Sequence, residues 1–493
     1  MRVLVVCNVD FVEWPLAFLE ALGESGASIE LTGLVLIDHS VHEHLTRRRG
    51  SLSFAAIHCL TEREREWMAR AGPADGAALE ARFGREIVRH AAIADRELSA
   101  GWVSGGVFPT SPLRQIGADP ARRTAYLSGL FDFLDDLLGR GFDAVLAPPA
   151  QEAAGIALAH LARRHGITYV TPKHIGLGAK MCLFDDPRAM QPCFRSEFAD
   201  GAPSAANQAV ARAWLADFRG RPVAPEYMAA ARRMTFTAPS PVLLAALAWR
   251  WLRRRPPEAL AYPYPESRLV FELRRWFGTW PLFAPRFDVV EKVIEAPYVY
   301  YALHYEPEMS VSAACPEFTD QLAVIESLSK ALPVGWRVVV KEHLPMTGRR
   351  PRGFLARIRR MPGVLLVAPQ ADGFALLSAA RAVVTLTGTV GLEAVLLRRP
   401  VLFLGPSPIQ IVEGGWVRAD NLARLGDALD AALATPPADD AVLERFLACL
   451  FDAAVDLPAA DWWGGTASVT QDAVARHMPT CRRMAQLLTR VLE

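Results

Sequence analysis

Short apolar runs alternate with amphipathic stretches from the beginning of the chain. Residues 1–7 are rich in valine and leucine, a pattern typical of a strand covered on both faces. Residues 11–22 place leucines at helical spacing, and residues 31–37 form a second apolar run. This order of strand, helix and strand predicts the start of a doubly wound sheet. Residues from about 40 to 100 are rich in charge and predict helices.

The alternation continues over the next segment. Residues 121–138 predict an amphipathic helix, 142–147 a buried strand, 151–165 a helix with a small-residue face, and 167–170 another strand. Strand, loop, helix and strand together occupy about 30 residues, which is the size of a βαβ unit. The sequence therefore predicts that the first half continues as a sheet of the same kind.

A second and more regular alternation begins near residue 296. It predicts strands at residues 298–303, 336–341, 364–367, 382–386 and 400–404. It predicts helices between them at residues 318–332, 353–361, 372–380 and 390–397. Because strands that alternate with helices form parallel sheets, this region also belongs to the α/β class.

The regularity weakens from about residue 200 to 290, where proline is frequent. The predicted organisation is an N-terminal α/β domain at residues 1–200, a connecting or inserted helical segment at 201–290, a second α/β domain at 291–465, and a C-terminal helix at 466–493 that packs back on the first domain. A chain of 493 residues is long enough for two such domains.

Composition narrows the class of protein. Hydrophobic residues make up 51% of the chain and charged residues 22%, with a formal net charge of +1. This balance provides no overall field for nucleic acid, so we expect no nucleic-acid partner. The seven cysteines include no C-x-x-C pair, which argues against a zinc ribbon and favours a reducing cytoplasm. We expect neither a signal peptide nor a membrane span.

One segment allows two interpretations, one of which is contact with a membrane surface. Residues 248–257 read AWRWLRRRPP, which mixes tryptophan with arginine. Such a segment can contact anionic lipid or a lipid-linked acceptor, which would place the protein peripherally on the inner membrane. The alternative is the end of an ordinary helix whose tryptophans pack inward.

The strongest local motif is VVTLTGTVGLEAVLLRRPVLFLG, at residues 383–405. A strand ends in small and hydroxylated residues, and a helix follows with an acidic residue in its first turn. The amides and positive dipole of a helix start favour phosphate, and a carboxylate there can accept hydrogen bonds from ribose hydroxyls. Alternatively, the threonine caps the helix and the carboxylate complements its dipole. The predicted nucleotide-binding residues are Thr387, Gly388, Thr389, Gly391 and Glu393.

Two further motifs follow predicted strands of the same region. Lys341, Glu342 and His343 come directly after one strand, and Arg349 and Arg350 follow a few residues later. We expect Lys341 and His343 to contact the phosphate of a nucleotide. The two arginines could help to hold an anionic ligand, although arginines are common on protein surfaces. The first strand of the region is followed by YYALHYEPEMS, in which we expect His304 and Glu308 to line the cleft. Each could equally be an ordinary loop residue.

Three residues in the first half also follow directly after predicted strands. Asn8 and Asp10 follow the first strand, and Glu152 follows the strand at residues 142–147. A general base for a sugar hydroxyl must be a carboxylate or a histidine that faces the cleft. We therefore take Asp10 and Glu152 as candidate catalytic residues, with His343, and Asn8 as cleft-lining. No cluster of ligands predicts a metal site.

Taken together, the motifs of the second region resemble those of bacterial capsule polysaccharide biosynthesis proteins, the group that includes the Kdo transferases of capsule export. The similar pieces are YVYYALHYEPE, DQLAVIESLSKALPVGWRVVVKEH and TGTVGLEAVLLRRPVLFLG. The resemblance implies a GT-B-type fold, with two Rossmann-like domains facing across a cleft, no metal, and the donor in the C-terminal domain. It also implies that His343 binds the donor phosphate, although Leu344 stands where the family has proline.

The function that follows is glycosyl transfer from a nucleotide sugar, with CMP-linked Kdo among the candidates, to a capsule or other surface polysaccharide or glycolipid. The acceptor would bind on the N-terminal domain. No cofactor is expected beyond the nucleotide-sugar co-substrate. Two alternatives stay open: a nucleotide-sugar epimerase on the same plan, and a non-catalytic scaffold of a polysaccharide assembly complex. The donor base and sugar, the acceptor, inversion or retention, and the oligomeric state are left undetermined.

Overall fold

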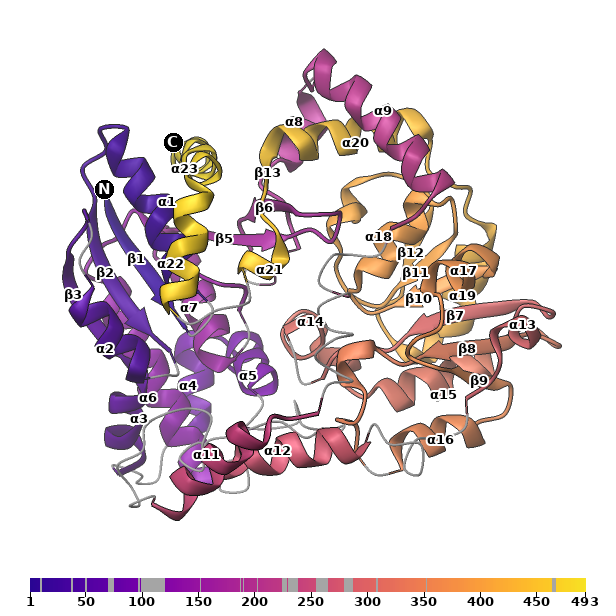
Figure 1. Ribbon diagram of the computed structural model, residues 1–493, viewed down its shortest axis with the longest axis horizontal. Coiled ribbons are helices and arrows are strands. Elements are labelled where there is room, and N and C mark those ends of the chain that lie inside the picture. Colours follow the sequence, from indigo (N-terminus) through magenta and orange to yellow (C-terminus); the bar gives the residue numbers. More distant parts are fainter. Residues whose placement is uncertain are drawn as a thin grey trace.

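The computed structural model covers the chain in two α/β halves joined by helices (Figure 1). It describes residues 1–493 except 9–10, 37–38, 49–50, 70–74, 96–97, 99–119, 151, 187, 189, 202, 224–227, 229–237, 254–264, 279–286, 307–308, 352 and 463–466. Within the described part of the chain, no helix is both long enough and apolar enough to cross a membrane.

The first half contains a seven-stranded sheet in the order β13-β6-β5-β4-β1-β2-β3. The first five strands of the chain pair in parallel, and β6 and β13 add to the sheet in antiparallel fashion. The strands are β1 (Arg2–Cys7), β2 (Glu30–Val35), β3 (Phe54–Cys59), β4 (Ala144–Leu146), β5 (Thr168–His174), β6 (Lys180–Phe184) and β13 (Ala454–Asp456).

Both faces of this sheet are covered by helices, which explains the apolar first strand. Val3 and Val5 face one buried cluster with α1 and α23, whereas Leu4 and Val6 face another with α6 and α7. The helices of this half are α1 (Glu13–Glu24), α2 (His39–Arg47), α3 (Leu60–Ala69), α4 (Gly76–Phe83), α5 (Arg85–Ala94), α6 (Pro120–Leu138), α7 (Ala153–Arg164), α21 (Ala459–Trp462), α22 (Ala467–Arg476) and α23 (Met478–Leu492).

The second half contains a six-stranded sheet in the order β12-β11-β10-β7-β8-β9, and every pair in it is parallel. Counted from β7, this is the Rossmann order 3-2-1-4-5-6, whose switch point lies between the first and fourth strands. The strands are β7 (Tyr298–Ala302), β8 (Arg337–Lys341), β9 (Val364–Val367), β10 (Ala382–Thr385), β11 (Val401–Phe403) and β12 (Trp416–Arg418).

Helices also cover both faces of the second sheet. Tyr300 and Val383 pack with α18 and α20 on one face, and Tyr301 and Val384 with α15 and α19 on the other. The helical elements of this half are α14 (Met309–Ser312), η3 (Pro316–Phe318), α15 (Gln321–Ala331), η4 (Leu344–Met346), α16 (Phe354–Arg360), α17 (Gly373–Ala379), α18 (Thr389–Leu396), η5 (Pro408–Ile411), η6 (Leu422–Arg424), α19 (Leu425–Ala434) and α20 (Asp440–Ala453).

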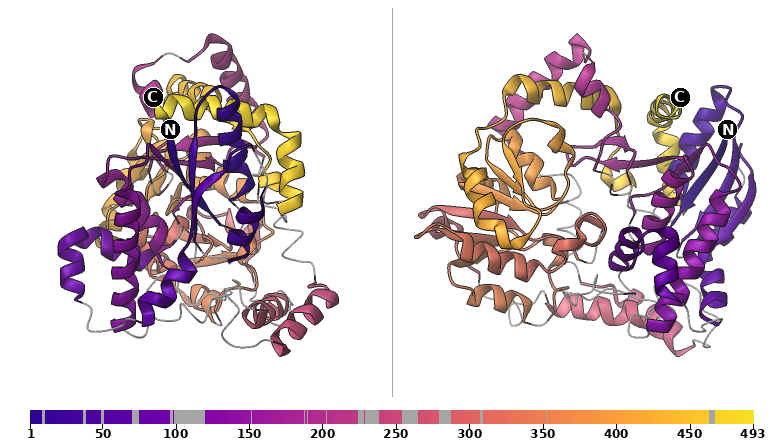
Figure 2. Two further views of the ribbon diagram at one scale, coloured as in Figure 1. Left: turned by 90° about the vertical axis from the view of Figure 1, so that its left-hand side faces the viewer. Right: turned by 180° about the vertical axis from the view of Figure 1, so that it is seen from behind.

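The stretch between the two sheets is helical where it is described. It contains α8 (Arg195–Asp200), α9 (Ala205–Gly220), α11 (Pro241–Leu252), α12 (Pro265–Gly278) and α13 (Val290–Val293). In Figure 1, α11 and α12 run together along the lower edge of the molecule, and the reverse view in Figure 2 shows the same arrangement. Trp249 of α11 is 55% exposed, so the alternative in which this tryptophan packs inward does not hold.

The predicted α/β class with two Rossmann-like sheets is confirmed. One local expectation is wrong: residues 40–100 are not purely helical, because β3 forms the edge of the first sheet there. Apart from Cys59, the residues of β3 are only partly buried or exposed, so the strand lacks the apolar run of β1. The antiparallel β6 and β13 were also not anticipated, since a three-residue strand such as β13 leaves little pattern in a sequence.

The chain returns to the first half after α20. β13 pairs with β6, and α23 lies beside α1, so that both ends of the chain are close together (Figures 1 and 2). Trp462 stacks on Trp14 with ring centroids 6.0 Å apart and on Phe18 at 6.4 Å. An aromatic cluster therefore anchors the returning segment on α1.

Candidate functional site

The switch point of the second sheet brings two predicted motifs together. His304 follows β7, and Thr385 ends the neighbouring strand β10. The Nε2 atom of His304 lies 3.2 Å from the hydroxyl of Thr385, which in turn accepts a hydrogen bond of 3.1 Å from the backbone N–H of Gly388. Because ligands of such sheets bind at the carboxyl ends of strands beside the switch point, this is the expected place for a donor nucleotide.

His304 has unused hydrogen-bonding capacity. Its ring is buried, and Nδ1 has no partner among the described residues, whichever way the proton shared with Thr385 lies. Burial lowers the pKa of His304 to about 4; the nearby side chain of Gln321 opposes this shift, and the positive charge of Arg350 adds to it. The imidazole is therefore neutral at pH 7. A buried polar atom without a partner is costly, so a ligand group is a natural partner for it.

Gly388 and Gly391 have different reasons to be glycine. A Cβ on Gly388 would lie 2.9 Å from the Thr385 hydroxyl and 3.1 Å from His304 Nε2, so a side chain there would disturb both groups. Gly391 is buried against the ring of Phe403 on β11, where a Cβ would overlap that ring. The absence of a side chain at Gly388 thus leaves room for the Thr385 hydroxyl and the His304 ring. The absence of one at Gly391 lets α18 pack closely on the sheet.

The other predicted residues at the start of α18 have different surroundings. The hydroxyl of Thr387 donates a 2.7 Å hydrogen bond to the carbonyl of Ser310, which ties the β10 loop to the β7 loop. Thr389 is the first residue of α18, after Gly388 as N-cap. Glu393 is buried one turn later, and burial raises its pKa to about 7.

The loop after β8 lies next to the switch point, because β8 pairs with β7. Lys341 is the last residue of β8, and burial lowers its pKa. His343 is partly buried. Burial, together with the nearby positive charges and His304, lowers the pKa of His343 to about 3. His343 is therefore a neutral hydrogen-bond donor at pH 7 rather than a cation.

A buried ion-pair network supports both loops. Arg350 contacts Glu306 at 2.8 Å and Glu342 at 3.1 Å, and all three side chains are at most 4% exposed. Arg350 also donates to the backbone carbonyl of His304 at 2.6 Å. Our expectation that this arginine binds an anionic ligand is wrong, because two carboxylates already neutralise it. It instead holds the loops that carry His304 and His343.

Arg349 lies at the rim of the same network. Its guanidinium donates to the hydroxyl of Tyr305 and sits 5.4 Å from the centroid of that ring. The ring of Tyr305 approaches His343 edge-on, at 6.4 Å between centroids. The network was not predictable from the sequence, which shows the charges of residues 306, 342 and 350 but not that they meet.

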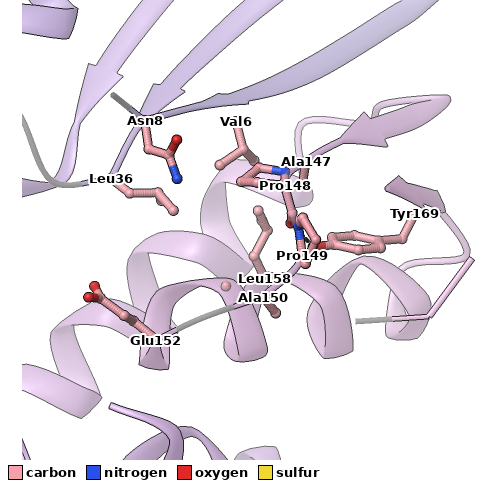
Figure 3. Close-up of a pocket in the computed structure, with 11 residues that line it drawn as sticks. Val6, Asn8, Leu36, Ala147, Pro148, Pro149, Ala150, Glu152, Leu158 and Tyr169 are labelled. Atoms are coloured by element: carbon pink, nitrogen blue, oxygen red, sulfur yellow. Dashed lines mark hydrogen bonds between the residues drawn. The ribbon is translucent and has the colours of Figure 1, made fainter. Parts of the chain in front are cut away.

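The first sheet has its own hollow at the equivalent switch point, between β1 and β4 (Figure 3). The hollow is small, with an accessible volume of about 20 Å³. Asn8 enters from the end of β1, and Glu152 from the N-cap position of α7. The rest of the lining is apolar and includes Pro148, Pro149 and Tyr169.

The structure groups the predicted residues at two places. His304, Thr387, Gly388, Thr389 and Glu393 surround the switch point of the second sheet, with Lys341 and His343 on the adjacent loop. Asn8 and Glu152 share the hollow of the first sheet. Asp10 and Glu308 lie outside the described residues. Thr385 and Gly176, which contact these motifs, were missed, and only their places at a strand end and in a glycine-rich loop could have indicated them.

No group of three or more histidine, cysteine, aspartate or glutamate side chains is arranged to hold a metal ion in the parts of the chain that are described. Asp185 pairs with Arg195 at 2.6 Å, and Asp186 accepts hydrogen bonds from three backbone amides. These two adjacent carboxylates are therefore structural.

Comparison with solved structures finds remote similarities. A "beta Kdo 2,4 transferase", KpsC of Thermosulfurimonas dismutans, is 13% identical with a TM-score of 0.37, and the match covers 68% of this chain and 87% of that chain. UDP-GlcNAc 2-epimerase of Methanocaldococcus jannaschii is 13% identical with a TM-score of 0.26, covering 92% and 99%. Anabaena Alr3699/HepE, solved with UDP and glucose, is 11% identical with a TM-score of 0.27, covering 97% and 99%.

No curated protein matches the chain significantly. A family model does match, over residues 286–412, and its description is "Capsule polysaccharide biosynthesis protein". The matched segment contains β7 to β11 and all the second-half motifs described above. The similarity to capsule polysaccharide biosynthesis proteins that these motifs indicate is thus confirmed over residues 286–412, about a quarter of the chain.

Proposed function

We propose that this chain is a glycosyltransferase of capsule or surface polysaccharide synthesis, which transfers a sugar from a nucleotide-sugar donor to a glycan or lipid-linked acceptor. The donor would bind at the switch point of the second sheet and the acceptor at the hollow of the first. The family match over residues 286–412 supports the pathway, and the geometry of the switch point supports the chemistry.

One observation carries the donor site. His304 is buried with Nδ1 unpaired among the described residues, and its other ring nitrogen, Nε2, contacts Thr385 beside Gly388 at the start of α18. A phosphate oxygen at the start of α18 would receive both the helix amides and a hydrogen bond from a neighbouring side chain. Such pre-placed donors stabilise the negative charge that develops when a nucleotide phosphate leaves a sugar.

The other residues of the proposed donor site would make different contacts with the nucleotide sugar. Lys341 would supply the positive charge for the phosphate, and the neutral His343 a directional hydrogen bond. Glu393, with its pKa raised to about 7, could exchange hydrogen bonds with ribose hydroxyls. We keep a CMP-linked sugar, with Kdo among the candidates, as the donor to test first.

On the acceptor side, a base must face the sugar hydroxyl that attacks. Glu152 is the described candidate, because it lines the hollow of the first sheet together with Asn8 (Figure 3). The flat faces of Pro148 and Pro149 offer apolar contact for a sugar ring. Asp10 follows the same strand as Asn8 and stays a second candidate for the base.

We also propose that the protein works at an anionic membrane surface, which it contacts through α11. On α11, Val242, Trp249 and Leu252 are exposed at the spacing of a single helix face. No acidic residue occurs between residues 241 and 255, whereas arginines occupy positions 250 and 253–255. An apolar stripe with a cationic end suits the headgroup region of an anionic bilayer, where a lipid-linked acceptor would be presented.

The test is a thermal-shift panel of CMP, UDP, GDP and their sugars on the wild type, on His343→Ala and on His165→Ala. A ligand that binds only the folded protein raises the melting temperature. Loss of a hydrogen bond to a charged group costs about 1.5–3 kcal/mol, so His343→Ala should bind the same nucleotide about ten- to a hundredfold more weakly. His165, which pairs with Asp135 away from the site, is the matched control.

The outcomes separate the candidate functions. A shift with one nucleotide that is weakened only in His343→Ala supports the donor site. Release of an epimerised nucleotide sugar in the absence of any acceptor would favour an epimerase instead. A folded wild type that binds no nucleotide would overturn the transferase and favour a scaffold of a polysaccharide assembly complex.

A further inference from the structure

A loop of the first half reaches the start of α18 in the second half. The loop joins β5 to β6 and runs through residues 175–179. Ile175 and Leu177 are almost fully buried, and they belong to the same hydrophobic cluster as Leu392 of α18. Although it belongs to the first sheet, this loop therefore packs as part of the second half.

Gly176, between these two apolar residues, touches Thr389. Its φ is +89°, a conformation that side chains rarely adopt. A Cβ at this position would overlap the Cγ2 methyl of Thr389 and lie 3.0 Å from its Cβ. Thr389 is β-branched and stiff about χ1, so it cannot simply rotate its methyl away without also moving its hydroxyl.

Gly178 provides a contrast in the same loop. Its φ is +57°, so it also has a left-handed backbone, but a Cβ there would meet nothing within 4 Å. The need for glycine at 178 is therefore conformational alone. At 176 the need is conformational and also steric, and the steric partner is a predicted nucleotide-binding residue.

The loop is held too firmly to retreat from Thr389. Ile175 N–H donates to the carbonyl of Lys180 at 3.1 Å, and Lys180 N–H donates to Leu177 at 3.1 Å. Leu457, which follows β13, donates to the carbonyl of Ala179 at 2.9 Å. A side chain added at residue 176 would therefore be accommodated mainly by displacing Thr389 and the first turn of α18.

We propose that Gly176 is a positioning residue of the donor site, through which the acceptor half fixes Thr389 at the start of α18. The inference rests on the proposed nucleotide site at α18, which the unpaired Nδ1 of buried His304 supports independently of this loop. The donor site is then composite: one half supplies the helix amides and the other half sets the place of the hydroxyl beside them.

The experiment compares nucleotide affinity, by titration calorimetry with the nucleotide that stabilises the wild type, in four variants: Gly176→Ala, Gly178→Ala, Thr389→Ser and the double variant Gly176→Ala/Thr389→Ser. Serine keeps the hydroxyl but lacks the methyl that a Cβ at residue 176 would meet. A displacement of about 1 Å can cost about a hundredfold, so Gly176→Ala should bind about ten- to a hundredfold more weakly. Gly178→Ala should bind close to the wild type.

The double variant separates positioning from folding. Measured against Thr389→Ser, adding Gly176→Ala should cost much less affinity than it costs in the wild-type background. The inference is overturned if Gly176→Ala binds like the wild type, if Gly178→Ala loses as much, or if serine at 389 gives no rescue. If Gly176→Ala does not fold, the double variant against Thr389→Ser decides. A wild type that binds none of the nucleotides overturns the proposed function, and this inference with it.

Discussion

The buried carboxyl of Glu393 links the stability of the protein to pH. It is buried one turn after the start of α18, not in the first turn as the sequence predicted, and burial raises its pKa from 4.5 to about 7. The folded protein therefore keeps this proton at pH values where the unfolded chain has released it. The stability that the protonated Glu393 carboxyl gives the folded protein is therefore fully present below pH 4.5. It is lost as the pH rises towards about 7.

We predict that Glu393→Gln removes this loss of stability at rising pH, because glutamine does not ionise. From about pH 5 to about pH 8, the wild type should lose stability relative to the variant by an amount on the order of 3 kcal/mol, since each pKa unit corresponds to about 1.4 kcal/mol. Melting temperatures across that range provide the measurement, and Glu413→Gln at an exposed position is the control. A constant difference between wild type and Glu393→Gln at every pH would show that the carboxyl titrates normally.

At the scale of elements, the short helix α21 attaches the returning end of the chain to the first half. Its Trp462 contacts Trp14, Phe18 and Phe11, with ring centroids 5.8–6.4 Å apart. Only a few residues of α21 and β13 hold this connection before α22 and α23 cover α1. The ring of Trp462 is therefore the main apolar contact that α21 itself makes with α1.

We predict that Trp462→Ala destabilises the first half by about 3–5 kcal/mol, the usual cost of removing a buried aromatic ring. The loss should appear as a lower melting temperature and as faster proteolysis within residues 454–493. Trp249→Ala, at the exposed ring of α11, should leave both unchanged. Equal effects of the two substitutions would contradict the role assigned to α21.

The elements also show what sequence could and could not predict. The strands of the second sheet were predictable because each is buried on both faces and followed by an amphipathic helix. That the loop motifs meet at one edge was predictable because the carboxyl ends of parallel strands lie together. β13 was not, since its partner β6 is about 270 residues away in sequence. Neither was the role of Arg350, because ion pairing between loops depends on tertiary contacts. Gly176 was missed for the same reason.

For the molecule as a whole, α11 and α12 lie along one edge that both halves share (Figures 1 and 2). Gly348, in the loop after β8, packs against the backbone of Arg275 in α12 so closely that a Cβ there would overlap the carbonyl oxygen. A surface that engages α11 is thus mechanically connected, through α12, to the loop that carries His343. The proposed membrane contact and the proposed donor site are thus linked by closely packed backbone of α12 and the loop after β8.

We predict that the protein co-sediments with vesicles containing anionic phospholipid and much less with neutral vesicles. Binding should weaken at high salt, because exposed charges are screened. The double variant Trp249→Ser/Leu252→Ser should lose most of this binding at an unchanged melting temperature. Val334→Ser, at a fully exposed apolar residue elsewhere, is the matched control. Equal sedimentation of the double variant and the wild type would rule out α11 as the contact.

The pairing of β13 with β6 has a consequence for how the protein is made. Residues 184 and 454 are about 270 positions apart, so at about 5–20 residues per second the ribosome needs roughly 15–50 s to supply the last strand of the first sheet. During that interval β6 is an open edge that could pair with other nascent chains. The second half, although later in the sequence, has all its strands before the first half receives its final one.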